Sequence, residues 1–111
     1  MERVLNYAKH TMVAYMGEEA LSRLSCYIAE SSLGDIPKIS PVSVDSELKC
    51  IDLMHFGWNI GKAFGKKRIH TSTFIKNLFA HAMRDIKVST IEHKISHTES
   101  EWRIMLDGNI I

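Results

Sequence analysis

Residues 46–64 constrain the fold more than any other part of the chain. Their apolar side chains follow two helical lines, one beginning at Leu48 and one at Leu53, which cover more than half of the helix circumference. A helix of this kind is usually central and contacted on several sides. Gly57 and Gly61 stand four residues apart in it, and each costs about 1 kcal/mol relative to Ala in a helix interior. We therefore expect a neighbouring backbone to approach closely at these glycines.

Helical patterns also precede this segment. Residues 2–16 place apolar side chains at i, i+3, i+4 and i+7 spacing, and a second run continues beyond Gly17 to about residue 30. Two antiparallel helices and one long kinked helix both fit Gly17. Residues 35–45 are expected to be extended, because Pro37 and Pro41 push the residues before them away from helix.

Helix-capping signals set the expected boundaries of the later helices. Asp45 or Ser46 would begin the central helix, since both are good N-caps. Thr71 or Ser72 would begin the next helix, which runs through Arg84.

A short helix is predicted next, beyond a turn over residues 85–88. The sequence from Ser89 to Glu92 matches a capping box with Ser89 as the cap. Farther on, residues 102–107 alternate in part and predict one short strand, which needs a pairing partner elsewhere. The fold class is therefore mainly α: a compact domain of four to five helices with one short C-terminal strand.

The chain is expected to form a single domain over residues 1–111, because this length can bury a core without disulfides or metal. Its parts are an N-terminal helical segment (1–34), an extended connector (35–45) and a C-terminal half (46–111) that carries the later helices and the strand.

The net charge of +1 hides an uneven distribution. Residues 62–94 carry eight Lys or Arg against two Asp or Glu, a net charge of +6, whereas residues 1–61 carry −3 and residues 95–111 carry −2. A basic block between two acidic ones indicates a surface for a polyanion such as nucleic acid.

The order helix, short turn, capped helix with a polar outer face resembles the helix-turn-helix and winged-helix DNA-binding domains. The resemblance is local, over residues 72–97, and one residue fewer stands between the turn and the cap than in that family. It implies a helix-turn-helix-like C-terminal half, with the short helix in the major groove and the strand in the place of a wing. The implied nucleic-acid contacts are Lys66, Lys67, Arg68, Lys87, Thr90, His93 and Lys94.

No catalytic signature is present. His93 and His97 are four apart, but Glu92 precedes them, so the HExxH order of a zinc protease is absent. We expect no catalytic residues, no metal and no cofactor. Cys26 and Cys50 form no CxxC pair, and two free thiols favour a reducing, cytoplasmic setting. No signal peptide or membrane-length apolar run is seen.

These features predict a small non-catalytic regulator that binds nucleic acid, expected to be duplex DNA, through a basic face. The alternative is a small protein-binding module or inhibitor of the phage- or mobile-element type, which blocks a partner protein such as a nucleic-acid-handling complex. An unpaired strand at 102–107 would also suit a homodimer. No membrane partner is expected.

Overall fold

The computed structural model describes residues 2–95 and residue 104. The described residues form a compact, mainly helical fold, as predicted, and contain five α-helices and no strand. The helices are α1 (Glu2–Met12), α2 (Glu18–Ser32), α3 (Cys50–Ala63), α4 (Arg68–Leu78) and α5 (Val88–Lys94). Apart from Ile104, which is not in a strand, the expected strand at 102–107 lies outside the described residues.

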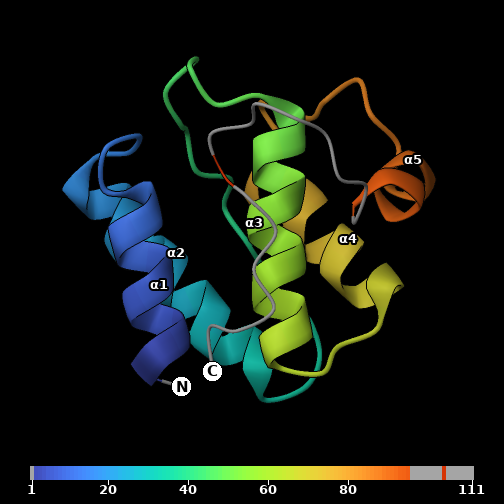
Figure 1. Cartoon of the computed structure of the whole chain (residues 1–111), viewed down its shortest axis with the longest axis horizontal. Coiled ribbons are helices and arrows are strands. Elements are labelled where there is room, and N and C mark those ends of the chain that lie inside the picture. The colour runs from blue at the N-terminus through green and yellow to red at the C-terminus, as the bar shows by residue number, and fades with distance from the viewer. Residues whose placement is uncertain (1, 96–103, 105–111) are drawn as a thin grey trace.

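Helix α3 occupies the centre of the molecule. Figure 1 shows α1 and α2 on one side of it and α4 and α5 on the other. Helix α3 contacts α1 and α4, and α4 contacts α5 in turn. Nine of its residues are buried, so the expectation of a central helix contacted on several sides is confirmed.

The two glycines of α3 lie against α4. A Cβ atom added at Gly57 would stand 2.1 Å from Cγ1 of Ile75, and one at Gly61 would stand 2.1 Å from Oγ1 of Thr71. Both distances are far shorter than a van der Waals contact, so only glycine lets α4 lie this close. The predicted close approach is therefore confirmed, with α4 as the neighbour.

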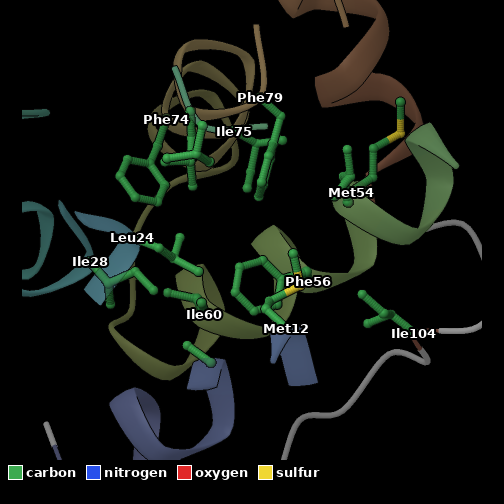
Figure 2. Packing of buried hydrophobic residues seen from close by; sticks show 14 of the residues in the cluster. Met12, Leu24, Ile28, Met54, Phe56, Ile60, Phe74, Ile75, Phe79 and Ile104 are labelled. Carbon is green, nitrogen blue, oxygen red and sulfur yellow. The ribbon is translucent and has the colours of Figure 1, made fainter. Parts of the chain in front are cut away.

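The hydrophobic core forms where α1, α2, α3 and α4 meet (Figure 2). Phe56 of α3 lies at its middle, with its ring stacked on Tyr7 at 5.8 Å between centroids. The same ring meets Phe79 edge-on at 6.4 Å. Ile104 joins the core from the C-terminal end of the chain and is only 4% exposed. The fold therefore buries residues from nearly its whole length in one cluster.

The N-terminal segment is two helices rather than one kinked helix. Gly17 has extended backbone angles (φ −70°, ψ 164°) and is the N-cap of α2. The following connector lacks helix and strand and is fixed by two backbone hydrogen bonds, from Val42 N to Leu78 O (2.9 Å) and from Asp45 N to Tyr15 O (2.7 Å).

The predicted start of α3 at residue 45 or 46 was wrong. Asp45 closes a tight turn instead, accepting hydrogen bonds from Glu47 N at Oδ1 (2.8 Å) and from Leu48 N at its carbonyl oxygen (3.1 Å). The N-cap is Lys49. Its N–H donates to Oδ2 of Asp52 (3.0 Å), so the capping carboxylate stands inside the helix.

The predicted limits of the next helix were also wrong. Helix α4 begins at Arg68 and ends at Leu78, well before Arg84. The backbone of Phe79 leaves helical geometry (φ −111°, ψ 41°), and a hydrogen bond from Met83 N to Phe79 O (3.0 Å) closes the turn that follows. The connection to α5 therefore spans residues 79–87 rather than 85–88.

Helix α5 begins two residues earlier than its capping signal predicted. Lys87 is the N-cap, and its carbonyl oxygen accepts from Thr90 N (3.0 Å) and Ile91 N (3.1 Å). The half-buried Val88 extends the buried stripe of Ile91 and Ile95, which favours the earlier start. Ser89 therefore lies inside the helix, and no side-chain capping bond is formed.

Across residues 2–95, none of the helices is both long and apolar enough to span a bilayer.

Candidate nucleic-acid interface

Arg68, at the start of α4, contacts both α3 and α5. Its guanidinium carbon lies 5.4 Å from the centre of the Trp58 ring of α3, and its Nη2 donates to the carbonyl oxygen of Glu92 in α5 at 2.5 Å. The ammonium of Lys62 lies 5.5 Å from the same Trp58 ring. Two cations therefore share one half-buried indole, at the point where the start of α4 meets the end of α5.

The outer face of α5 carries the polar side chains that the sequence assigned to base recognition. Thr90, His93 and Lys94 are exposed, whereas Ile91 and Ile95 are buried. A helix with this division packs against the core through its apolar side and turns its polar side outward. Lys87, just before α5, is exposed as well.

The two lysines directly before α4, Lys66 and Lys67, differ in their surroundings. Lys66 donates from Nζ to the carbonyl oxygen of Gly34 (3.3 Å), and His70 donates from Nε2 to the same oxygen (3.0 Å). Lys66 is thereby held at the end of α2. Lys67 is exposed at the N-cap of α4, beside Arg68.

The structure thus brings Arg68 to α5, whose outer face carries three more of the predicted residues, Thr90, His93 and Lys94, while Lys67 is the exposed residue directly before Arg68. Lys87 stands at the start of α5. Only Lys66 is directed elsewhere. Arg68 has a structural role in addition, because it bonds to the backbone of α5.

Trp58 and Lys62 belong to this surface, although neither was among the predicted contacts. Trp58 is half-buried and packs against the hydrophobic core. The signal that could have revealed the pair is their spacing of four residues near the end of a helix, just before a basic loop. Trp102, the other tryptophan, lies outside the described residues.

A second polar cluster is buried in α3, and the sequence did not single it out. Asp52 and His55 are each 1% exposed, and Asn59 is fully buried. Asn59 donates from Nδ2 to the hydroxyl of Tyr7 (2.7 Å). The visible signal was a line of three polar residues at helical spacing within an apolar helix.

Asp52 and His55 bind the two backbone polar groups of one distant residue. Ile104 N donates to Oδ1 of Asp52 at 3.0 Å, and His55 Nδ1 donates to Ile104 O at 2.7 Å. We refer to Asp52 and His55 together as the α3 clamp. Satisfying both groups of Ile104 offsets the cost of burying its backbone away from water.

Within residues 2–95 and residue 104, no group of three or more His, Cys, Asp or Glu side chains could hold a metal ion. His93 is an exposed side chain of α5, and its predicted neighbour His97 lies outside the described residues. Gly65 has a positive φ of 69° and ends α3, as expected of a helix-stop glycine.

Comparison with known proteins found no family model, no curated protein and no solved structure that matches this chain.

Proposed function

We propose that this protein is a small, non-catalytic regulator that binds duplex DNA through a basic surface made by Trp58, Lys62, Lys67, Arg68, Thr90, His93 and Lys94. The observation that carries the proposal is the junction at Arg68. It places the cations of Arg68 and Lys62 and the ring of Trp58 beside the C-terminal end of α5. Cations and a ring of this kind suit a phosphate backbone and its sugars.

Helix α5 is the element that would read the bases. Its seven residues make a helix about 10 Å long, which fits the major groove. In the helix-turn-helix arrangement, Thr90, His93 and Lys94 would face base edges, and Lys67 and Lys87 would contact phosphates. The nine-residue connection of residues 79–87 is longer than the turn of that family, so the proposal rests on the exposed surface rather than on the turn.

The test is fluorescence anisotropy with a labelled duplex at several salt concentrations. The logarithm of affinity should fall linearly with the logarithm of salt concentration, with a slope of about −0.9 for each phosphate contact. The double variant Lys67→Glu plus Lys94→Glu should lose binding while keeping the helical circular dichroism spectrum, because both side chains are exposed.

The matched control is Lys9→Glu plus Lys38→Glu, which makes the same charge change at two exposed residues of the N-terminal half. It should retain most of the affinity, since only the net charge and not the surface around Arg68 is altered. Equal losses in the two double variants would show that any binding is a nonspecific effect of net charge.

The protein-binding alternative would use exposed apolar side chains as contacts. Leu33 is 87% exposed at the end of α2, and Val13 is 60% exposed after α1. Val13 and Leu33 follow the ends of two helices that run in opposite directions (Figure 1), so each is a single exposed apolar side chain and not part of a shared patch. A protein-binding module would leave the anisotropy of the labelled duplex unchanged at low salt. Leu33→Ser would abolish binding to its partner protein.

A further inference from the structure

A pocket of about 280 Å³ lies between two segments of the chain that are neither helix nor strand. One wall is the end of the connector, residues 42–46 together with Leu48, and the other is residues 81–82, in the connection between α4 and α5. We call this space the connector pocket. A cavity of about 150 Å³ accommodates benzene, so the connector pocket has room for one ring with a short substituent.

Hydrogen bonds to neighbouring helices hold both walls of the connector pocket in place. Val42 N donates to Leu78 O (2.9 Å), which ties the connector to the last residue of α4. On the opposite wall, the carbonyl oxygen of Ala82 accepts from Sγ of Cys50 (3.5 Å), the first residue of α3. Because both walls are already fixed, little conformational freedom is lost when a ligand binds between them.

The connector pocket combines an apolar interior with a polar mouth. Val42 is 1% exposed and Leu48 is 6% exposed, so these two side chains line its deeper part. Ser43, Ser46 and His81 are exposed and line its mouth. Sites of this composition hold the body of a small molecule by apolar contacts and orient it by a few polar groups.

The charge of the connector pocket comes from Asp45. Of the described residues that line the pocket, Asp45 alone carries a carboxylate, and none is Lys or Arg. Its N–H donates to Tyr15 O (2.7 Å), its carbonyl oxygen accepts from Leu48 N (3.1 Å), and its Oδ1 accepts from Glu47 N (2.8 Å). No described residue donates to its Oδ2. The carboxylate is therefore held in position with one oxygen left for a ligand, and its charge favours a cation.

We propose that the connector pocket binds a small organic cation, a primary ammonium attached to an apolar body about the size of one ring. The ammonium donates to Oδ2 of Asp45, and the apolar body packs against Val42 and Leu48. The hydroxyl of Ser46 is a further acceptor at the mouth. The pocket shares no residue with the basic surface around Arg68, so the proposal does not depend on nucleic-acid binding.

The test is an NMR titration of the backbone amides of the whole chain with benzylammonium near neutral pH. The amide signals of Val44, Ser46 and Ala82 should shift together, with a Kd on the order of 10 mM for a ligand of this size. Benzyl alcohol has nearly the same shape without the charge, and it should bind about threefold more weakly because it forms no ion pair. Phenylacetate, which carries the opposite charge, should bind more weakly still.

The variant Asp45→Asn removes the charge and keeps a side-chain oxygen for the N–H of Glu47. It should weaken the binding of benzylammonium about threefold and leave that of benzyl alcohol unchanged, so that the two probes bind equally. The matched control is Asp35→Asn, which makes the same charge change at an exposed residue after the end of α2. It should leave the binding of both probes unchanged.

A second variant, Ala82→Leu, changes no charge and fills part of the connector pocket. It should weaken the binding of both probes about fourfold or more, because its side chain takes the place of the apolar body. Ala82 is exposed, so the larger side chain should leave the core intact. If Asp45→Asn fails to fold, Ala82→Leu and the comparison of the two probes on the wild-type chain still decide the matter.

Three results would overturn the proposal. The first is that the amide signals around the connector pocket do not shift with benzylammonium. The second is that benzyl alcohol binds the wild-type chain as tightly as benzylammonium does, or that Asp35→Asn weakens the ammonium as much as Asp45→Asn does. The third is that Ala82→Leu binds both probes as tightly as the wild-type chain, since the ligand would then lie elsewhere.

Discussion

Two helices of this protein bind the backbone of a distant residue in the same way, one at the surface and one in the core. In α2, Arg23 Nη1 donates to Ser40 O (3.0 Å), and the hydroxyl of Tyr27 accepts from Ser40 N (3.2 Å). We call this pair the α2 clamp. The α3 clamp does the same for Ile104. The pairs are spaced by four and by three residues, so each places both side chains on one helical face.

The two clamps differ in burial, and burial decides what each is worth. Ser40 is exposed, so water can replace either bond of the α2 clamp at little cost. The α3 clamp is 1% exposed, and water has no access to the groups left behind. The same pair of hydrogen bonds therefore contributes little to stability at the surface and much more in the core.

The largest expected effect is that of Asp52→Ala. It removes the acceptor of two N–H groups, those of Lys49 and Ile104. Leaving them without a partner should lower the free energy of unfolding by roughly 3 kcal/mol, measured by urea denaturation. Asp45→Ala is the control, because Asp45 is exposed and its side chain accepts from Glu47 N, and it should cost less than about 1 kcal/mol.

Asp52→Ala can also break the comparison of the two clamps. Tyr27→Phe removes the corresponding acceptor from the α2 clamp and should cost no more than about 1 kcal/mol. If the two variants were equally stable, burial would not be what separates the clamps.

The next largest effect is expected at Gly57. Its Cβ would stand 2.1 Å from Ile75 Cγ1, so Gly57→Ala forces α3 and α4 apart. We expect a net loss of about 2 kcal/mol, after allowing about 1 kcal/mol for the better helix propensity of Ala.

Gly17 gives the matched surface control. It has no neighbour within 4 Å of an added Cβ, and its φ of −70° suits any residue. Gly17→Ala should therefore cost less than about 1 kcal/mol, which covers the weaker preference of an N-cap for Ala than for Gly. A thermal shift as large as that of Gly57→Ala would show that helix packing is not the cause.

Arg68 is half-buried, so its removal should lower the free energy of unfolding by less than the two changes above. Arg68→Ala removes the bond to Glu92 O and the contact with Trp58, for an expected loss of about 1.5 kcal/mol. The indole emission of Trp58 should change with it. Lys67→Ala, at the exposed neighbouring residue, should leave both stability and emission nearly unchanged, and a comparable loss there would contradict the assigned role of Arg68.

Periodicity predicted the helices well because it reports the burial that stabilises them. The central place of α3 followed from its apolar lines, and the close approach at Gly57 and Gly61 followed from their cost in a helix. The boundaries were less accurate. Asp45 was expected to cap a helix and instead closes a turn, because the same side chain satisfies N–H groups in either structure.

The α3 clamp could not be predicted from the sequence for a different reason. Its hydrogen bonds join residues 49 and 52 positions apart, and no local pattern specifies the partner of a buried polar side chain. The direction of Lys66 could not be predicted for the same reason, since its partner is the carbonyl oxygen of Gly34, just after the end of α2. Charge along the sequence indicated a basic surface but not which cations are directed away from it.

The smallest effect is expected from the titration of Tyr27. The N–H of Ser40 donates to the phenolic oxygen and lowers the pKa of Tyr27 below its ordinary value, and the Arg23 guanidinium adds to this. A group whose pKa is lower in the folded state stabilises the fold above the unfolded pKa and loses that contribution as pH falls through the folded pKa. The α2 clamp should therefore strengthen slightly as pH rises from the folded pKa of Tyr27 to its higher unfolded pKa.

The measurement is an NMR titration of the Tyr27 ring carbon. Its midpoint should lie below that of a tyrosine in an unstructured peptide and should move upward in Arg23→Ala, because the cation beside the tyrosinate is lost. The α3 clamp provides the contrast, since Asp52→Ala should leave this midpoint unchanged while lowering stability far more. A midpoint that did not respond to Arg23→Ala would mean that the two side chains of the α2 clamp act independently on Ser40.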